Sequence, residues 1–482
     1  MSASILTAWP VVVLHLLAQV GFILRALWRP HREPSSRLAW VVVILSVPAF
    51  GMIAYVLFGE TRIGRRRAAE YHRIAREMAH PQDPARHGDM DLAGERHAHL
   101  FHLGRSISGM GPVGGNSARL MADGDAAIAG LVADIDAARH RVHLLFYIWL
   151  ADGNGRRVAE ACMRAAQRGV TVRVMADDLG SRKLVKSELW RRMAAAGVRT
   201  SRALPVGFLP LHPIRGRVDL RNHRKIAVID GAIAYCGSQN CADPAFLPKA
   251  AYGPWVDLMV RFEGPLAAQN DWLFAADWLA HERAALEELT ALPDTVPRSG
   301  GVVAQAIGTG PTVRASAMPE MFEALMHAAR HELVVTTPYF VPNEAMQSAL
   351  CAAAMRGVAT TIVFPARNDS RIVAAASRSY YSELLSAGVR IHEFPDGLLH
   401  AKSLTLDGEV ALIGSANLDR RSFELNYENT VLLRDTALTA DLRARQQRWI
   451  DASRLVTREE VEAWSSARHL WYNAVAMLGP VL

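Results

Sequence analysis

The sequence predicts two copies of one α/β unit, related by a pseudo-two-fold axis and preceded by an N-terminal transmembrane helical hairpin. The first observation behind this prediction is a phrase that occurs twice in the 482-residue chain. "HRKIAVIDGAIAYCGSQN" (His223–Asn240) returns as "HAKSLTLDGEVALIGSAN" (His400–Asn417). The other two observations are further repeats around that phrase and two long uncharged segments near the amino terminus. At this length, two domains or one duplicated domain is the expected organisation.

The duplication extends well beyond the repeated phrase. The short sequences "AARH", "RGV" and "AGVR" occur in the same order before each copy, starting at Ala137, Arg168 and Ala196 and again at Ala328, Arg356 and Ala387. Each flanks an apolar, strand-like run or closes an Ala-rich helical pattern, as in an α/β repeat. We therefore expect a basic and polar linker at 61–115, a first repeat at 116–290, and a second repeat with a C-terminal helical tail at 291–482.

Two uncharged segments near the amino terminus, Ser2–Leu24 and Leu38–Phe58, are each long enough to span a bilayer. The first lacks the basic start of a signal peptide, and a second apolar segment follows it, so residues 1–60 are predicted to form two transmembrane helices. More arginines follow the second segment than flank the loop between the two, which favours a cytoplasmic body. A shallow hairpin that does not fully cross the membrane is the alternative.

Charge and residue usage narrow the classes of partner. The formal net charge of +7 and the pI of about 9.4 favour an anionic partner, such as a phosphate or an acidic lipid surface. Only five of the 54 basic residues are lysines, and two of these, Lys225 and Lys402, occupy the same place in the repeated phrase. A compact ammonium group is therefore expected to be needed there. The four cysteines and the histidines between 72 and 102 show no metal-ligand spacing, so no metal site is expected.

Each copy of the phrase is typical of a strand that ends in an Asp-Gly turn and returns as a second strand. A His and a Lys two residues apart point to one face of a strand, so each imidazole should lie beside its ammonium group. If Asp-Gly fills the two turn positions, His223 faces Ser238 and His400 faces Ser415. Four neutral side chains are then expected to bind a phosphate beside the imidazoles: Ser238, Asn240, Ser415 and Asn417.

This set of groups suits phosphodiester exchange without a metal or other cofactor. One imidazole attacks phosphorus, while the other protonates the leaving oxygen on the opposite side. Two ammonium groups hold the equatorial oxygens, and the two-fold repeat supplies one of each group from either side.

The doubled His-x-Lys-x4-Asp pattern resembles the signature of the phospholipase D superfamily, over about Ala137 to Asp435. The resemblance implies two α/β sandwich units of that superfamily's fold and a covalent phosphohistidine intermediate. By analogy His223 is the nucleophile and His400 the general acid, although the sequence allows the opposite order. The resemblance also adds carboxylates: the motif residues Asp230 and Asp407, expected to order their hairpins, and Asp257 and Glu428, expected to orient the histidines.

Within this superfamily, "TTPYFVP" (Thr336–Pro342) and "GSANLDRRSFELNYE" (Gly414–Glu428) resemble segments of the bacterial cardiolipin synthases. The run "FGETRIGRRR" after the second apolar segment fits the same family. This resemblance implies a multi-pass enzyme of the bacterial inner membrane with a cytoplasmic catalytic body. Its partners would be phosphatidylglycerol and membrane phospholipids, not nucleic acid. Two phosphatidylglycerols would be joined to cardiolipin with release of glycerol and without a cofactor.

Two stretches depart from that resemblance: "CADPAFLPKAAYGPW" (Cys241–Trp255) and the Pro-rich "PVGFLPLHPIRG" (Pro205–Gly216), a lid, a lipid-contacting element or an ordinary packed loop. They leave water, an ethanolamine lipid or a simple alcohol open as acceptors, and thus a hydrolytic phospholipase D as the alternative. A nuclease of the same superfamily is opposed by the membrane segments and the modest charge. A non-enzymatic membrane scaffold is opposed by the two intact motifs.

Overall fold

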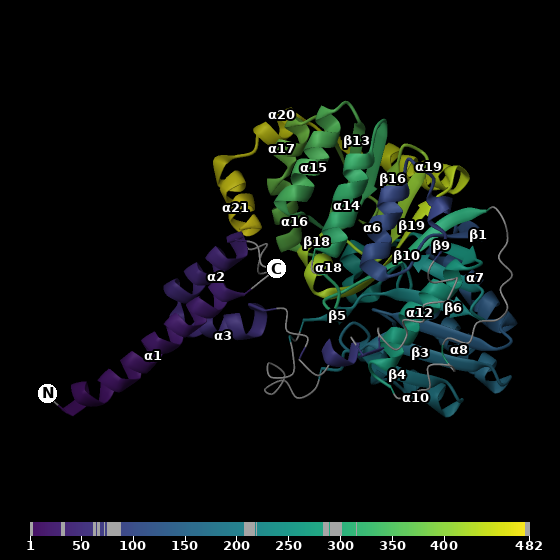
Figure 1. The fold of residues 1–482 in the computed structure, drawn as a ribbon, viewed down its shortest axis with the longest axis horizontal. Helices are drawn as coiled ribbons and strands as arrows, with labels where there is room; N and C mark the ends of the chain where they lie inside the picture. Colours follow the sequence, from purple (N-terminus) through teal and green to yellow (C-terminus); the bar gives the residue numbers. More distant parts are fainter. Residues whose placement is uncertain are drawn as a thin grey trace.

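The computed structural model describes residues 3–29, 34–60, 64, 68–71, 73–74, 88–206, 217, 219–282, 289, 301–314 and 316–477. Its body is an α/β fold in which helices pack on both faces of a long mixed sheet, and the N-terminal helices project from one side (Figure 1). Two expectations from the sequence lie outside the described residues: the repeat boundary near residue 290 and most of the Pro-rich loop at 205–216.

The strand order of the sheet is the same on either side of its central pair, β1 (Val113–Leu120) and β10 (Val302–Thr309). Outward from β1 the order is β9, β7, β6, β2, β3, β4, and outward from β10 it is β19, β17, β16, β11, β13, β14, with β20 at that edge. Strands β2, β3 and β4 pair in parallel, and so do their counterparts β11, β13 and β14. The other neighbouring strands in both halves, including β14 and β20, pair antiparallel. The predicted duplication is confirmed.

The bounds of these strands are β2 Arg141–Phe146, β3 Thr171–Asp177, β4 Arg199–Ala203, β6 Lys225–Ile229, β7 Ile233–Gly237, β9 Met259–Glu263, β11 Glu332–Thr336, β13 Ala359–Pro365, β14 Arg390–Phe394, β16 Ser403–Leu406, β17 Val410–Gly414, β19 Asn426–Arg434 and β20 Arg454–Val456. The "RGV" and "AGVR" phrases end the helices that precede β3, β4, β13 and β14, which explains why they repeat.

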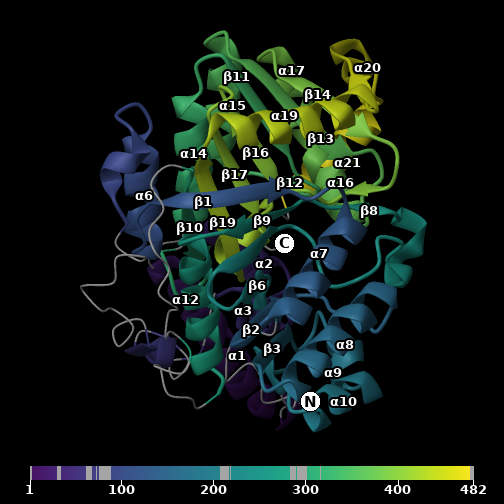
Figure 2. The same ribbon diagram turned by 90° about the vertical axis from the view of Figure 1, so that its right-hand side faces the viewer.

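Helices connect the strands and bury their apolar faces against the sheet. Asp123 and Asp152 cap α7 and α8 by accepting backbone N–H groups of the first turn. Figure 2 shows the second repeat above the first, with β1 and β10 between them. The main helices are α7 Gly124–Ala137, α8 Gly153–Gln167, α9 Arg182–Val185, α10 Glu188–Ala195, α12 Leu266–Leu279, α14 Ala317–Ala328, α15 Glu344–Met355, α16 Arg371–Ser379, α17 Tyr381–Ser386, α18 Arg420–Glu424, α19 Thr436–Asp451, α20 Arg458–Glu462 and α21 Ser466–Ala476.

The two repeats share one core rather than packing as separate globules. Phe274 of α12 and Leu442 of α19 are fully buried in the same apolar cluster, which also contains residues of β6 and β7 from one repeat and of β10 and β17 from the other. A shared core fixes the position of one repeat relative to the other. Any site built from both repeats is therefore held in place by the whole interior.

Part of the segment expected to be a solvated linker belongs to the core. Residues 98–108 form helix α6 (Ala98–Ser108), preceded by the short 3-10 helix η1 (Met90–Ala93). Leu100 and Phe101 of α6 are fully buried beside residues of the second repeat. The prediction of a polar linker was wrong here because the surrounding histidines obscured the apolar face of a short helix.

The N-terminal hairpin of two spans is not confirmed. Within the described residues, one helix is long and apolar enough to cross a membrane: α1 (Ala3–Trp28), through its segment Trp9–Trp28. The second expected span is divided into α2 (Pro34–Ser46) and α3 (Pro48–Phe58). A methyl group on Gly51 would lie 2.6 Å from the carbonyl oxygen of Val43, so the chain bends sharply between them. Pro48 has no N–H to donate and disfavours a helical residue before it, which accounts for the break.

Polar contacts hold the ends of these apolar helices. The buried carboxylate of Glu60, just after α3, pairs with Arg25 at 2.6 Å and Arg29 at 2.5 Å, both near the end of α1. Arg217 of the first repeat donates to the backbone carbonyl of Phe58 at 2.7 Å. The N-terminal helices are thus tied to one another and to the body of the protein.

The register of both motif hairpins differs by one residue from the predicted register. Asp230 and Gly231 occupy the central turn positions with φ of 51° and 65°, and the N–H of Ala232 donates to the Ile229 carbonyl at 3.0 Å. However, Ile229 pairs with Ile233, so Ala232 is an additional residue in the returning strand. The second hairpin has the same offset, since Leu406 pairs with Val410. The predicted pairings of His223 with Ser238 and of His400 with Ser415 were therefore wrong.

Candidate active site

Each motif histidine follows a two-residue strand that pairs with the opposite repeat. The strand before His223, β5 (Arg221–Asn222), pairs in parallel with the start of β19, and the N–H of His223 donates to the Tyr427 carbonyl at 2.9 Å. The strand before His400, β15 (Leu398–Leu399), pairs in parallel with β8 (Trp255–Val256), and the N–H of His400 donates to the Val256 carbonyl at 2.8 Å. Backbone hydrogen bonds thus hold each histidine against the opposite repeat.

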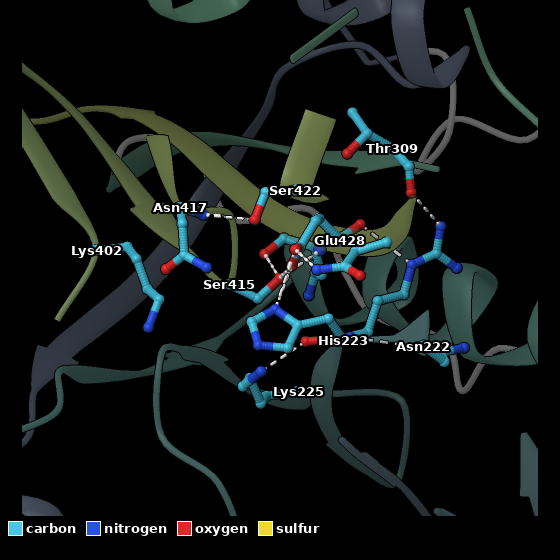
Figure 3. A network of polar contacts seen from close by, with 12 residues as sticks. Asn222, His223, Lys225, Thr309, Lys402, Ser415, Asn417, Ser422 and Glu428 are labelled. Atoms are coloured by element: carbon cyan, nitrogen blue, oxygen red, sulfur yellow. Dashed lines mark hydrogen bonds and ion pairs between the residues drawn. The ribbon is translucent and has the colours of Figure 1, made fainter. Parts of the chain in front are cut away.

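A carboxylate from the opposite repeat orients each imidazole. Nδ1 of His223 lies 2.8 Å and 3.0 Å from the two carboxylate oxygens of Glu428, and Nδ1 of His400 lies 2.6 Å from Oδ1 of Asp257. Figure 3 shows the first of these contacts, with Lys225 close to the same imidazole and Lys402 of the second repeat to one side. An ionised carboxylate can only accept, so Nδ1 carries the hydrogen. The Nε2 lone pair of each neutral ring is then available for chemistry.

The two motif serines contact the carboxylates that orient the histidines. Ser415 donates its hydroxyl to Glu428 at 2.5 Å and accepts the N–H of Asn429 at 2.9 Å. Ser238 donates to Asp257 at 2.6 Å and accepts the N–H of Leu258 at 3.0 Å. Each serine was expected to donate to a phosphate, but its one hydroxyl hydrogen is used here. The pairing of β7 with β9 and of β17 with β19 places each serine beside its carboxylate.

The motif lysines are buried beside the histidines of their own strands. Nζ of Lys225 donates to the His223 carbonyl at 2.7 Å, and Nζ of Lys402 donates to the His400 carbonyl at 2.6 Å. Burial lowers the pKa of Lys225 to about 8 and that of Lys402 to about 7. An ammonium group has three donors, so each lysine keeps two N–H groups for an anion. Desolvated cations of this kind interact strongly with a phosphate brought into the site.

The protonation states favour a neutral nucleophile at neutral pH. Burial lowers the pKa of His223 and of His400 to about 4, although a carboxylate beside each ring opposes that effect. Burial also disfavours the charged form of Asp257, but His400, Lys402 and Ser238 together lower its pKa to about 2. The pKa of Glu428 is likewise lowered, because the pull of His223 and its other partners outweighs burial. Both pairs therefore consist of a neutral imidazole and an ionised carboxylate.

Both histidines line one cavity of about 360 Å³. Asn240 and Asn417 line the same cavity, as the repeated phrase predicts. Asn240 accepts the N–H of Ile148 through Oδ1 at 3.1 Å, while its Nδ2 is buried and has no hydrogen-bond partner among the described residues. A buried amide donor without a partner is costly unless a ligand satisfies it. This donor is therefore available to a ligand in the cavity.

The motif aspartates lie at the turns and bind backbone amides. Asp230 accepts the N–H groups of Arg139, His140 and Arg141 at 2.8 to 2.9 Å. Asp407 accepts the equivalent N–H groups of residues 330, 331 and 332 in the second repeat, as well as a side-chain contact from Arg96 at 2.6 Å. These amides belong to the recurring "AARH" phrase and to the residue after it. The aspartates therefore order the strands that carry the histidines and do not line the cavity.

In the part of the chain that the structure describes, no group of three or more His, Cys, Asp or Glu side chains is arranged to hold a metal ion. All four cysteines are buried as free thiols. The histidines and asparagines of the two motifs line the cavity, and the motif lysines are hydrogen-bonded to the carbonyl groups of those histidines.

Comparison with known proteins decides the family. A family model described as "Cardiolipin synthase, PLD-like domain" matches residues 131–269 and 322–449, and one described as "Phospholipase_D-nuclease N-terminal" matches residues 17–60. Cardiolipin synthase A of Serratia proteamaculans is 38% identical over 480 residues, which cover 98% of this chain and 97% of that one. Cardiolipin synthase A of Salmonella arizonae is 37% identical over 479 residues, with the same coverage. The chain belongs to the cardiolipin synthases of the phospholipase D superfamily.

The fold of this member of the cardiolipin synthases is shared by a solved structure outside them. Phosphatidylserine synthase of Haemophilus influenzae superposes with a TM-score of 0.59, covering 80% of this chain and 100% of that chain at 15% identity. At that identity the likeness shows the fold alone. It supports the duplicated α/β architecture of the cardiolipin synthase body.

Reasoning from the sequence missed two features of this cardiolipin synthase site. The exchange of carboxylates between repeats is one, because strand pairing across the chain leaves no local pattern. The other is an aromatic neighbour for each histidine: the ring of Tyr147 meets His223 at 4.8 Å between centroids, and Trp255 meets His400 at 4.5 Å. Trp255 lies two residues before Asp257, and this proximity was the one signal that could have placed it in the site.

Proposed function

We propose that this protein joins two phosphatidylglycerol molecules into cardiolipin and releases glycerol, in two displacements at one phosphorus atom. The observation that carries the proposal is the shared cavity, in which each of two imidazoles is held through Nδ1 by a carboxylate of the opposite repeat. Membership of the cardiolipin synthases gives the substrate class. The repeats, proposed at 116–290 and 291–482, contribute one histidine, one lysine and one carboxylate each.

In the first displacement, Nε2 of one histidine attacks phosphorus of the donor lipid. The bond to the headgroup glycerol breaks, and the second histidine gives its Nε2 proton to the departing oxygen. The resemblance to the superfamily makes His223 the nucleophile and His400 the acid. His400 is neutral in the free site, and the negative charge of a bound phosphate favours its protonated form. Asp257 then stabilises the resulting imidazolium.

In the second displacement, the headgroup hydroxyl of another phosphatidylglycerol attacks the phosphatidyl-histidine. His400 takes the proton of this hydroxyl and returns to the protonated form in which it began the first displacement, while the phosphorus–nitrogen bond at His223 breaks. One phosphodiester is exchanged for another, so no external energy source enters the balance. Throughout, Lys225 and Lys402 hold the equatorial oxygens with the Asn240 and Asn417 amides beside them.

Membrane attachment keeps the site close to its lipids. The apolar segment Trp9–Trp28 is long enough for a membrane anchor, and the family model for the N-terminal region of the superfamily matches residues 17–60. We propose that the protein resides in the bacterial inner membrane with the catalytic body on the cytoplasmic side. A lipid substrate then reaches the cavity from the bilayer without dissolving in water.

Phosphatidylglycerol with separate labels in its phosphate and its headgroup glycerol tests the proposal. The purified full-length protein should yield labelled cardiolipin and one free glycerol for each cardiolipin formed. Phosphatidic acid as the main product would instead show hydrolysis, and no turnover of the lipid would overturn the proposed function. His223→Ala and His400→Ala provide the controls, because each should remove both products.

A further inference from the structure

A polar cluster from both repeats forms part of the wall of the catalytic cavity. Nζ of Lys249 lies 2.5 Å from Oδ2 of Asp369, and the hydroxyl of Tyr339 donates to Oδ1 of the same carboxylate at 2.7 Å. Lys249 belongs to the short 3-10 helix η3 (Leu247–Tyr252) of the first repeat, and the other two residues belong to the second repeat. All three line the cavity that contains both histidines.

This cluster lies on the His400 side of the cavity. Phe246, directly before η3, stacks on Trp255 with ring centroids 3.9 Å apart, and Trp255 packs against the His400 ring at 4.5 Å. The segment that carries Lys249 is therefore in contact with the wall around His400. It is also the stretch of sequence that departs from the superfamily resemblance, which makes it a place where selectivity can differ.

Stability alone does not account for the ion pair. The Lys249 side chain is 47% exposed, and an ion pair with a lysine exposed to this extent contributes little to the free energy of unfolding. Asp369, in contrast, has only 3% of its side chain exposed and is held by two donors. The ammonium group of Lys249 has three N–H donors and gives one to Asp369, so two are available to an anion in the cavity.

We propose that Lys249, with Asp369 and Tyr339, forms the subsite that recognises the glycerol-phosphate headgroup of the acceptor lipid. This inference rests on the proposed function and names the group that selects its second substrate. The lysine pairs with the phosphate of the acceptor, and the carboxylate accepts a hydrogen bond from the headgroup hydroxyl that does not react. The remaining hydroxyl is then directed towards His400.

The chemistry of this cluster separates the possible acceptors. Phosphatidylglycerol offers an anionic phosphate and two hydroxyl groups, which match a cation beside a hydrogen-bond acceptor. An ethanolamine lipid also carries a phosphate, but its headgroup has no hydroxyl group to donate to Asp369 or to attack the intermediate. Water and simple alcohols have no phosphate for the lysine. The departing glycerol of the donor also has none, so Lys249 should act on acceptor binding more than on the first displacement.

A competition experiment with the full-length protein tests this assignment. Phosphatidylglycerol serves as donor and acceptor in detergent micelles, and n-butanol competes as an uncharged acceptor. Lys249→Gln should lower the ratio of cardiolipin to phosphatidylbutanol about ten- to hundredfold, the range expected when a charged hydrogen bond is lost. The ratio should fall because the KM for phosphatidylglycerol as acceptor rises, while the rate of transfer to butanol stays unchanged. Lys249→Arg should restore most of the ratio.

Lys183→Gln, the same charge change at an exposed position of α9, is the matched control and should keep the wild-type ratio. A Lys249→Gln enzyme with the wild-type ratio would overturn the inference. So would equal losses of cardiolipin and phosphatidylbutanol, since these show a structural role. Failure of the proposed function is separate, because the wild-type protein itself would then form no cardiolipin.

Discussion

Nδ1 of His223 in the first repeat lies 2.8 Å from the Glu428 carboxylate in the second repeat, and the reciprocal pair of His400 and Asp257 is 2.6 Å apart. Neither repeat therefore holds a complete histidine–carboxylate pair of its own. The duplication thus shapes the candidate site as well as the fold, because each half supplies the carboxylate that contacts the motif histidine of the other. Substituting either carboxylate should therefore affect the histidine of the other repeat.

Glu428→Gln should lower kcat by about 10²- to 10⁴-fold, because an amide can donate to Nδ1 and stabilise the wrong tautomer. Asp257→Asn should have a comparable effect at His400. Steady-state kinetics with a thermal unfolding curve for each variant provides the measurement. If either variant keeps the wild-type kcat while folded, its carboxylate does not orient a reacting imidazole.

Ser415→Ala should reduce kcat about ten- to hundredfold with little change in KM, because the serine acts on phosphorus through Glu428. Ser238→Ala is the matched change behind Asp257. The ratio of the effects on kcat and KM decides between two roles. A rise in KM at constant kcat would support the direct contact with phosphate that the sequence predicted.

Asp407→Ala should destabilise the fold by about 1–3 kcal/mol, because three backbone N–H groups lose the charged carboxylate that accepts from them. Activity per folded molecule should change little, since this side chain is remote from the cavity. Arg96→Ala is the control. It removes the partly exposed ion pair but leaves the amide contacts, so its effect on the free energy of unfolding should be smaller.

The activity should depend on pH with two limbs. Below about pH 4 His223 becomes protonated and the nucleophilic lone pair is lost, since burial lowers the pKa of this histidine to about 4. On the alkaline side, Lys402 loses its charge near pH 7 and Lys225 near pH 8. A profile of kcat/KM against pH should therefore fall in both directions from a maximum between these limits. A flat profile through the alkaline limb would exclude an electrostatic role for the two lysines.

Lys402→Met should abolish turnover yet raise the free energy of unfolding at pH 6 by about 1–4 kcal/mol, since a buried charge is replaced by an apolar side chain. The pKa of Lys402 in the folded protein is about 7, below its ordinary value of 10.5. The unfolded chain binds more protons between these values, so wild-type stability rises with pH there. The advantage of the variant should shrink over the same window. A constant advantage would contradict the lowered pKa.

The sequence was sufficient to predict the duplicated α/β fold and several residues that line the candidate site. Repeated phrases mark equivalent structural positions, as "AARH" shows: its amides bind Asp230 and Asp407 at equivalent turns. The sequence predicted that His223 and His400 share one site because the motif occurs twice. Local patterns of this kind can be recognised in a single sequence.

Features that depend on long-range geometry were not predictable in the same way. The additional residue at Ala232 moves every later side chain by one position, and turn composition alone does not reveal it. Pro48 ends α2, but Pro10 lies inside the continuous helix α1, so a proline alone did not predict the break and 21 uncharged residues looked like one continuous span. The Lys249–Asp369 pair joins residues 120 positions apart and leaves no periodic trace.

The stereochemical course at phosphorus distinguishes a covalent phosphatidyl-histidine from a direct transfer between lipids. A phosphatidylglycerol whose phosphorus carries one sulfur atom is chiral at phosphorus, and the configuration of the cardiolipin made from it can be determined. Two in-line displacements through a phosphatidyl-histidine invert the centre twice, so retention is expected. Inversion would show a single direct transfer between lipids and would contradict a covalent intermediate on either histidine.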